Sequence, residues 1–126
     1  AKYPRNCAYK EAEYSMNFPK YKEEKLQEQI DDYKKDGFPE HWGLFQSGFL
    51  MRNNRDEEVI QFNEKWLIEI EKYGKISPQC QVSLPYILWK TNIKFDIINS
   101  ETIWDTNRFI ITFHGTNQKF TPAYNK

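Results

Sequence analysis

Apolar side chains recur at steps of three and four residues between positions 57 and 73, and this stripe constrains the fold more than any other feature of the chain. Its members are Val59, Phe62, Trp66, Ile70 and Tyr73. This spacing puts them on one face of an α helix, so the sequence predicts an amphipathic helix over 57–73 that packs against a core. Asn54 or Asp56 is expected to cap its start, and Gly74 to end it.

A second helix is predicted over residues 22–35. Leu26, Ile30 and Tyr33 fall at positions i, i+4 and i+7 and share one face. Gly37 follows as a C-terminal stop, and Pro39 prevents continuation.

A third helix is predicted to begin at Ser77-Pro78, with the serine as cap and the proline at the first helical position. Pro85 falls inside this helix and should bend or divide it. Residues 1–21 show no clear period, and we expect an ordered loop there with one helical turn around Cys7–Tyr14.

Three short apolar runs are predicted to be strands: residues 44–52, Phe95–Ile98 and Phe109–Phe113. The first is expected to be buried on both faces, with Gly48 at a bulge or a close approach. The predicted fold class is therefore mixed α/β, with about three helices and a small mixed sheet.

The chain has 126 residues, a length that fits one small domain. We expect a single domain over residues 1–115 and a loose polar tail over 116–126. Aromatic residues make up 17% of the chain and can supply much of the core, or line a groove where sugar rings stack.

The charge balance argues against a nucleic-acid partner. There are 18 basic and 18 acidic residues, so the chain lacks the basic excess that a phosphate backbone requires. No apolar run approaches the roughly 20 residues that span a bilayer, and Ala1–Arg5 does not resemble a signal peptide. Processing of the N-terminus would remove that last evidence, so a cytoplasmic location and a Golgi-type lumen both stay open.

The two cysteines, Cys7 and Cys80, lack the spacing of a metal site and are expected to be thiols. A bridge between them is the alternative, and it would require an oxidising compartment. The sequence also contains no glycine-rich phosphate loop, no His-Glu-x-x-His zinc site and no Asp-x-Asp pair.

Two single residues are candidates for ligand contacts. His114 follows a predicted strand and precedes Gly115, a place where sites on α/β sheets collect, so it is either a metal or phosphate ligand or a surface strand end. Arg52 ends a predicted buried strand, and its guanidinium is expected to reach either a partner acid or a phosphate.

Polar residues also gather at the start of the third predicted helix. Gln79, Gln81 and Ser83 lie there, where free backbone N–H groups favour anions and a side-chain amide can hydrogen-bond sugar hydroxyls. Arg5 and Glu11 lie in the irregular N-terminal stretch, as solvated charges or as part of the same site.

Several short motifs occur together in a fixed order. The chain reads Tyr3-Pro4-Arg5-Asn6-Cys7-Ala8-Tyr9-Lys10-Glu11, then Gln29, Tyr33 and Gly37-Phe38-Pro39, then Gly43-Leu44, Gly48, Arg52 and Trp66 to Ile70, and finally Ser77, Gln81, Ser83, Tyr86 and His114. In this order and spacing they resemble the later part of a glycosyltransferase domain, once catalogued as of unknown function, which occurs in Golgi-type wall polysaccharide enzymes and in microbial capsule and glycan enzymes. The resemblance spans about residues 3–114.

The resemblance implies the C-terminal half of a GT-A-like transferase that moves a sugar from a nucleotide-sugar donor to a glycan or glycoprotein acceptor. In that interpretation Glu11 is the catalytic carboxylate, and His114 approaches a metal or the diphosphate. The substrate-binding residues would be Arg5, Arg52, Gln79, Gln81, Ser83 and Tyr86. The resemblance also implies Mn²⁺ or Mg²⁺ as cofactor and an upstream nucleotide-binding half.

The chain departs from the family pattern at Gln79-Cys80, where the family has Arg-Asp. The family aspartate is placed to act as base or to hold the acceptor, and a cysteine does not accept a proton near neutral pH as a carboxylate does. The alternative to a transferase is therefore a non-catalytic module that binds a glycan or a protein. A structural subunit with an aromatic interface is a third possibility.

Overall fold

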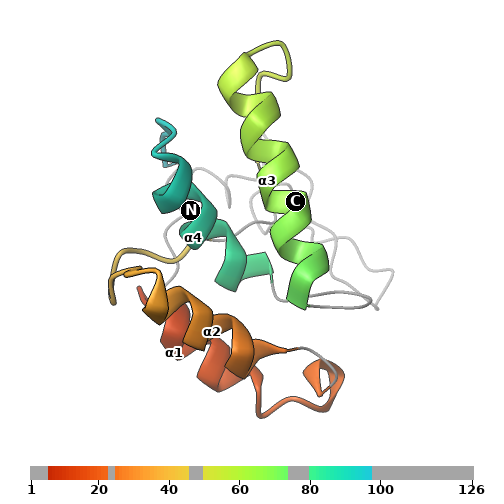
Figure 1. The fold of residues 1–126 in the computed structure, drawn as a ribbon, viewed down its shortest axis with the longest axis vertical. Coiled ribbons are helices and arrows are strands. Elements are labelled where there is room, and N and C mark those ends of the chain that lie inside the picture. The colour runs from red at the N-terminus through yellow and green to blue at the C-terminus, as the bar shows by residue number, and fades with distance from the viewer. Residues whose placement is uncertain (1–5, 23–24, 46–49, 74–79, 98–126) are drawn as a thin grey trace, which may run out of the picture. The chain divides into compact units, whose positions relative to one another are not determined.

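The computed structural model describes residues 6–22, 25–45, 50–73 and 80–97. Those from Asn6 to Phe95 belong to one compact unit, whereas Asp96 and Ile97 belong to another. Within the described ranges the elements are α1 (Ala8–Ser15), the 3-10 helix η1 (Pro19–Tyr21), α2 (Leu26–Lys35), α3 (Glu57–Tyr73) and α4 (Cys80–Thr91) (Figure 1).

The predicted fold class is wrong, because the described residues form four α helices and no β strand. In the predicted strand over 44–52, Phe45 makes only an isolated β-bridge, and Leu50–Arg52 are irregular. Met51 is 79% exposed, so the expected burial on both faces is also wrong. The predicted boundary at 115/116, the predicted strand Phe109–Phe113 and Gly48 lie outside the described residues.

The second predicted strand, Phe95–Ile98, is irregular over its described part, Phe95 to Ile97. The physical reason is that Phe45 and Phe95, one from each run, pack their rings on each other. The rings of Phe45 and Phe95 meet edge to face with centroids 5.4 Å apart, and Trp42 contacts both. Short apolar runs do not distinguish strand pairing from such packing.

Helix α1 is longer than the single turn predicted around Cys7–Tyr14, and the carbonyl of Cys7 accepts the Glu11 N–H at 3.1 Å. Ala8, Tyr9 and Ala12 are buried along one side. The helix contacts both α2 and α4. The burial of small residues lets α1 approach its neighbours closely, which fixes this end of the unit.

Helix α2 confirms the predicted helix with a later start, and its end confirms the predicted role of Gly37. Gly37 has a φ of +85°, the left-handed region that suits glycine. Its N–H donates to the Lys34 carbonyl at 3.1 Å, and the Phe38 N–H donates to the Tyr33 carbonyl at 3.0 Å. These two bonds form a Schellman motif, in which Phe38 packs back against Tyr33.

Helix α3 matches the predicted bounds, and Asp56 is its cap, because Asp56 Oδ1 accepts the Glu58 N–H at 2.9 Å. Helix α4 runs on through Pro85. The helix is therefore not divided, although proline removes the bond that the Gln81 carbonyl would otherwise accept. The predicted cap Ser77, with Pro78 and Gly74, lies outside the described residues.

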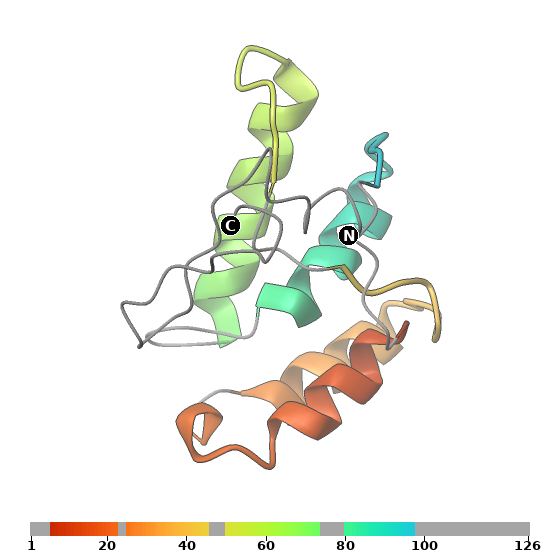
Figure 2. The same ribbon diagram turned by 180° about the vertical axis from the view of Figure 1, so that it is seen from behind.

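Helix α4 joins two hydrophobic clusters. The first contains Cys7, Ala8, Tyr9, Ala12, Leu26, Ile30, Tyr33, Phe38, Leu44, Tyr73 and Val82. The second contains Phe62, Trp66, Leu84, Ile87 and Leu88. Both views show α4 between the α1–α2 pair and α3 (Figures 1 and 2), so every described helix packs on it or on its direct neighbours.

Candidate functional site around helix α4

Helix α4 carries three of the residues that the sequence singled out, namely Gln81, Ser83 and Tyr86. Two groups of side chains extend from it. The first, the Arg52 cluster, consists of Arg52, Asn63, Trp66 and Ser83. The second, the Tyr86 cluster, consists of Tyr33, Asp36, Tyr86 and Lys90.

Ser83 is the interior end of the Arg52 cluster and is only 2% exposed. Its Oγ accepts the Trp66 Nε1–H at 2.9 Å and donates to the Cys80 carbonyl at 3.3 Å. Both partners of this buried hydroxyl are therefore supplied by the protein, as buried polar groups require. The bond fixes the indole of Trp66 against α4.

Arg52 is the solvent-facing end of the same cluster. Its Nη1 donates to Asn63 Oδ1 at 2.7 Å, and its guanidinium carbon lies 5.9 Å from the centroid of the Trp66 ring. Asn63 in turn donates from Nδ2 to Asn54 Oδ1 at 3.4 Å. Within the described ranges no acidic side chain pairs with Arg52. Of the two predicted partners, an acid or a phosphate, the acid is thus not found among these residues.

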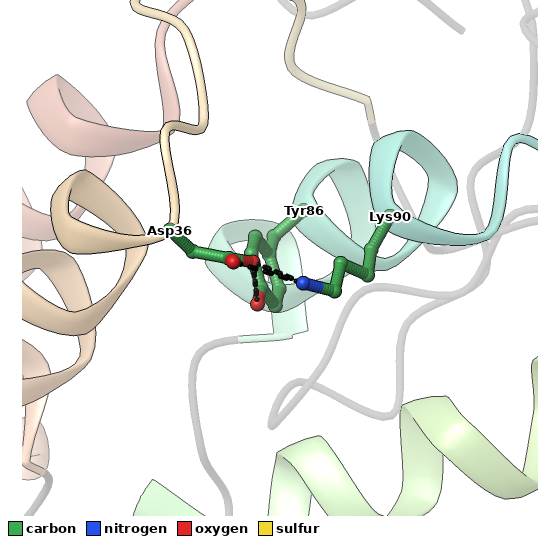
Figure 3. A network of polar contacts seen from close by, with 3 residues as sticks. All are labelled: Asp36, Tyr86 and Lys90. Atoms are coloured by element: carbon green, nitrogen blue, oxygen red, sulfur yellow. Dashed lines mark hydrogen bonds and ion pairs between the residues drawn. The ribbon is translucent and has the colours of Figure 1, made fainter.

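The Tyr86 cluster joins the end of α2 to α4 (Figure 3). The Tyr86 hydroxyl donates to Asp36 Oδ2 at 2.6 Å, and Lys90 Nζ lies 2.9 Å from Oδ1 and 2.6 Å from Oδ2 of the same carboxylate. The ring of Tyr86 stacks on that of Tyr33 with centroids 3.8 Å apart. Tyr86 is only half-buried, so one side of this cluster is open to solvent.

These contacts set the protonation states in the Tyr86 cluster. Hydrogen bonds from Lys90 and then from Tyr86 hold the pKa of Asp36 below its ordinary value. Burial, and then the bond to Asp36, raise the pKa of Tyr86 well above that of a free tyrosine. Tyr86 is therefore a neutral hydrogen-bond donor at physiological pH and not a phenolate base.

A further carboxylic acid, Glu69 on α3, lies near this cluster. Burial raises the pKa of its carboxyl, against the opposing effect of a hydrogen bond from Tyr33. On the same helix, the Tyr73 hydroxyl donates to Asp32 Oδ2 at 2.6 Å. Despite these acids, no three His, Cys, Asp or Glu side chains of the described part of the chain come together in a way that could hold a metal ion.

The predicted catalytic carboxylate, Glu11, lies on α1 and is 3% exposed. Because α1 packs on α4, Glu11 belongs to the same unit as Gln81, Ser83 and Tyr86. Gln81 is half-buried and Arg52 is exposed. Of the predicted site residues that the structure describes, Glu11 and Ser83 are therefore buried. The other three, Arg52, Gln81 and Tyr86, reach solvent. Arg5, Gln79 and His114 lie outside the described residues.

The predicted alternative of a Cys7–Cys80 bridge is wrong, because no disulfide joins the two residues. Cys7 is buried at the start of α1, whereas Cys80 is half-buried at the start of α4. The carbonyl of Cys80 accepts a hydrogen bond from Ser83 of the Arg52 cluster.

Sequence reasoning missed four members of these clusters: Asn63, Trp66, Asp36 and Lys90. Trp66 was predicted to be a core residue of the helical stripe and belongs to a motif of the resemblance, but a periodicity gives no signal for a hydrogen bond from its indole N–H. Asp36 and Lys90 are separated by 54 positions, so nothing local in the sequence pairs them.

Comparison of the chain with models of known protein families, with curated proteins and with solved structures found no match. The motifs that carry the resemblance nevertheless contact one another. Tyr9 donates its hydroxyl hydrogen to the Phe38 carbonyl, and Tyr33 stacks on Tyr86. Trp66 donates to Ser83.

Proposed function

We propose that this chain is the acceptor-side part of a glycosyltransferase, which transfers a sugar from a nucleotide-sugar donor to a glycan or glycoprotein acceptor. One observation carries the proposal. Motifs that are far apart in the sequence, and that resemble such enzymes in order and spacing, contact one another in pairs within one unit. The resemblance requires contacts of this kind, because its motifs would belong to one domain.

The side chains that reach solvent support this chemistry. Arg52 offers a guanidinium and Gln81 an amide, and these groups hydrogen-bond phosphates, carboxylates and sugar hydroxyls. The Tyr86 hydroxyl donates to Asp36, and its oxygen can still accept a hydrogen bond from a sugar hydroxyl. Tyr86 lies beside Trp89, with ring centroids 5.9 Å apart, and aromatic rings of this kind pack against the apolar faces of sugars.

The cofactor stays a prediction from the resemblance. The described residues hold no group that could bind a metal ion, and His114, the predicted ligand, lies outside them. Glu11, as the proposed base, would need access to the acceptor. In the described arrangement it is buried, so the proposal requires that the acceptor or an upstream half reorganise the start of α1.

A second candidate is a module that binds a glycan without transferring sugar. The observation that favours it is the chemistry at position 80, where the family aspartate is replaced by a half-buried cysteine. In this alternative Arg52, Gln81 and Tyr86 bind sugar, and Glu11 has only a structural role.

A ligand panel tests the proposal. Nucleotide sugars and oligosaccharides are added to the chain, with and without Mn²⁺, and thermal unfolding is followed. A ligand at a hundredfold excess over its Kd stabilises the folded state by about 2.7 kcal/mol. The proposal predicts stabilisation by at least one oligosaccharide and sugar transfer to it when donor and Mn²⁺ are present. Stabilisation without transfer selects the binding module, and no stabilisation by any sugar overturns both.

A further inference from the structure

Arg52 presents an exposed guanidinium that pairs with no acidic side chain of the described residues. Among those residues, it donates a hydrogen bond to the neutral amide oxygen of Asn63. A guanidinium carries several N–H donors in a rigid planar fork. In the part of the chain that the structure describes, the remaining donors of Arg52 meet no carboxylate.

The guanidinium is held from two sides. Asn63 accepts from Nη1 at 2.7 Å, and the ring of Trp66 lies 5.9 Å away. Trp66 is itself fixed, because its Nε1–H donates to the buried Ser83 at 2.9 Å. A side chain held in this way loses little further conformational entropy when a ligand binds, and this raises affinity.

Packing alone accounts for only part of this arrangement. Stacking on Trp66 explains why an arginine is favourable here, since the face of an indole attracts a cation. Stacking does not explain why Asn63, a neutral residue, also orients the guanidinium while no acid of the described residues pairs with it. The acids nearby in the sequence, Asp56 and Glu58, are not paired with Arg52, so its guanidinium is not taken up by either of them.

We propose that the Arg52 cluster is an anion-binding site, in which Arg52 takes a phosphate or carboxylate group of the sugar substrate. Asn63 and Trp66 are positioning residues that act through Arg52. This inference deepens the proposed function and rests on it for the identity of the ligand. The anionic group comes either from the diphosphate of the nucleotide sugar or from the carboxylate of an acidic sugar in the acceptor.

The surrounding charges set the strength of the site. Arg55 follows Arg52 in the same exposed segment, while Asp56, Glu57 and Glu58 begin α3. Asp56 uses its carboxylate to cap the Glu58 N–H. Because these charges of both signs are exposed, we expect binding to weaken as salt is added.

The test is a titration of the ¹⁵N-labelled full chain with inorganic pyrophosphate and, separately, with glucuronate. The signals to follow are the Arg52 Nε–H and the Trp66 indole N–H. Four variants accompany the wild type: Arg52→Gln, Arg52→Lys, Asn63→Ala and Arg55→Gln. Arg55 is an exposed arginine three residues away, so Arg55→Gln is the matched control for loss of a positive charge. The rest of each spectrum shows whether the variant is folded.

A saturable shift of both signals is expected with at least one probe. The shift of the Trp66 signal, which every variant retains, should disappear in Arg52→Gln, and the affinity measured from that signal should fall about tenfold in Asn63→Ala and in Arg52→Lys, the change expected for one charged hydrogen bond. Arg55→Gln should keep the wild-type affinity within about twofold. A response to pyrophosphate alone identifies the donor as the source, and a response to glucuronate alone identifies an acidic acceptor.

Two results overturn the inference: no saturable shift with either probe, or an equal loss of affinity in Arg52→Gln and Arg55→Gln. The proposed function fails separately, because it depends on the sugar panel. If the chain binds pyrophosphate at Arg52 but binds no sugar, the inferred anion site stands and the proposed transferase function is contradicted.

Discussion

The rings of Tyr33 and Tyr86 stack almost parallel, with centroids 3.8 Å and planes 11° apart, and so join α2 to α4. Tyr33 is among the most deeply buried large side chains, whereas Tyr86 is half-buried and turns its hydroxyl to Asp36. The stack therefore links the interior to the solvent-facing edge of the candidate site.

Replacing Tyr86 separates stacking from hydrogen bonding. Tyr86→Phe keeps the ring and loses the bond to Asp36, so it should cost about 0.5–1 kcal/mol of the free energy of unfolding. Tyr86→Ala also removes the ring and should cost about 2–3 kcal/mol. Urea unfolding of both variants measures the difference. Equal losses in the two variants would show that the stack contributes nothing.

Asp36 should make stability depend on pH in the acid range. Its pKa in the folded state lies below its ordinary value because Lys90 and Tyr86 donate to it. A lowered pKa gives stability that is present above the unfolded-state pKa of about 3.9 and is lost as pH falls through the folded-state value. In Asp36→Asn, the free energy of unfolding should therefore fall less steeply than in wild type as pH drops below about 5.

Chemical denaturation at a series of pH values measures this effect. Asp31→Asn, an exposed position on the same helix, is the control and should leave the slope unchanged. The same slope in wild type and Asp36→Asn would rule out the network of Figure 3 as a source of stability.

Glu69 should act in the opposite direction. Burial raises the pKa of its carboxyl in the folded state, so its contribution is complete below the unfolded-state pKa and is lost as pH rises through the folded-state value. Glu69→Gln has no ionisable group at this position, so the variant does not lose free energy of unfolding there as pH rises. Relative to wild type, the variant should gain stability as pH rises above the unfolded-state pKa of a glutamate, about 4.3, whereas Glu64→Gln, exposed on the same helix, should not. A pH-independent difference between Glu69→Gln and wild type would contradict the account.

Trp66→Phe tests the interior bond of the Arg52 cluster. Phenylalanine keeps an aromatic ring but leaves the buried Ser83 hydroxyl without its donor, so the variant should lose about 1–3 kcal/mol. Trp89→Phe is the matched control, because Trp89 is half-buried and its ring packs on Phe38 and Tyr86. A larger loss in Trp89→Phe than in Trp66→Phe would mean that the Trp66–Ser83 bond is unimportant.

Local signals in the sequence predicted the helices well. The stripe from Val59 to Tyr73 gave the bounds of α3, because one face of a helix must be apolar to pack. Gly37 marked the end of α2, because only a residue that adopts positive φ easily completes this kind of turn. Both features depend on residues that are close together in the chain.

The sheet was predicted wrongly because strand formation depends on a distant partner. Phe45 and Phe95 have the composition of strand residues, yet they pack on each other and on Trp42. The candidate site shows the same limit. Arg52 was predicted to bind a ligand, but its contacts with Asn63 and Trp66 depend on how the helices pack and have no local signal in the sequence.

The most direct test of the central claim is a two-dimensional NMR titration of the full chain with the nucleotide sugars and oligosaccharides of the panel. The signals to follow are the Gln81 side-chain amide, which reaches solvent from α4, and the Trp66 indole N–H beside Arg52. The account predicts saturable shifts of both signals with at least one sugar ligand. Unchanged signals at millimolar concentrations of every ligand would contradict the proposal that this surface binds sugar substrates.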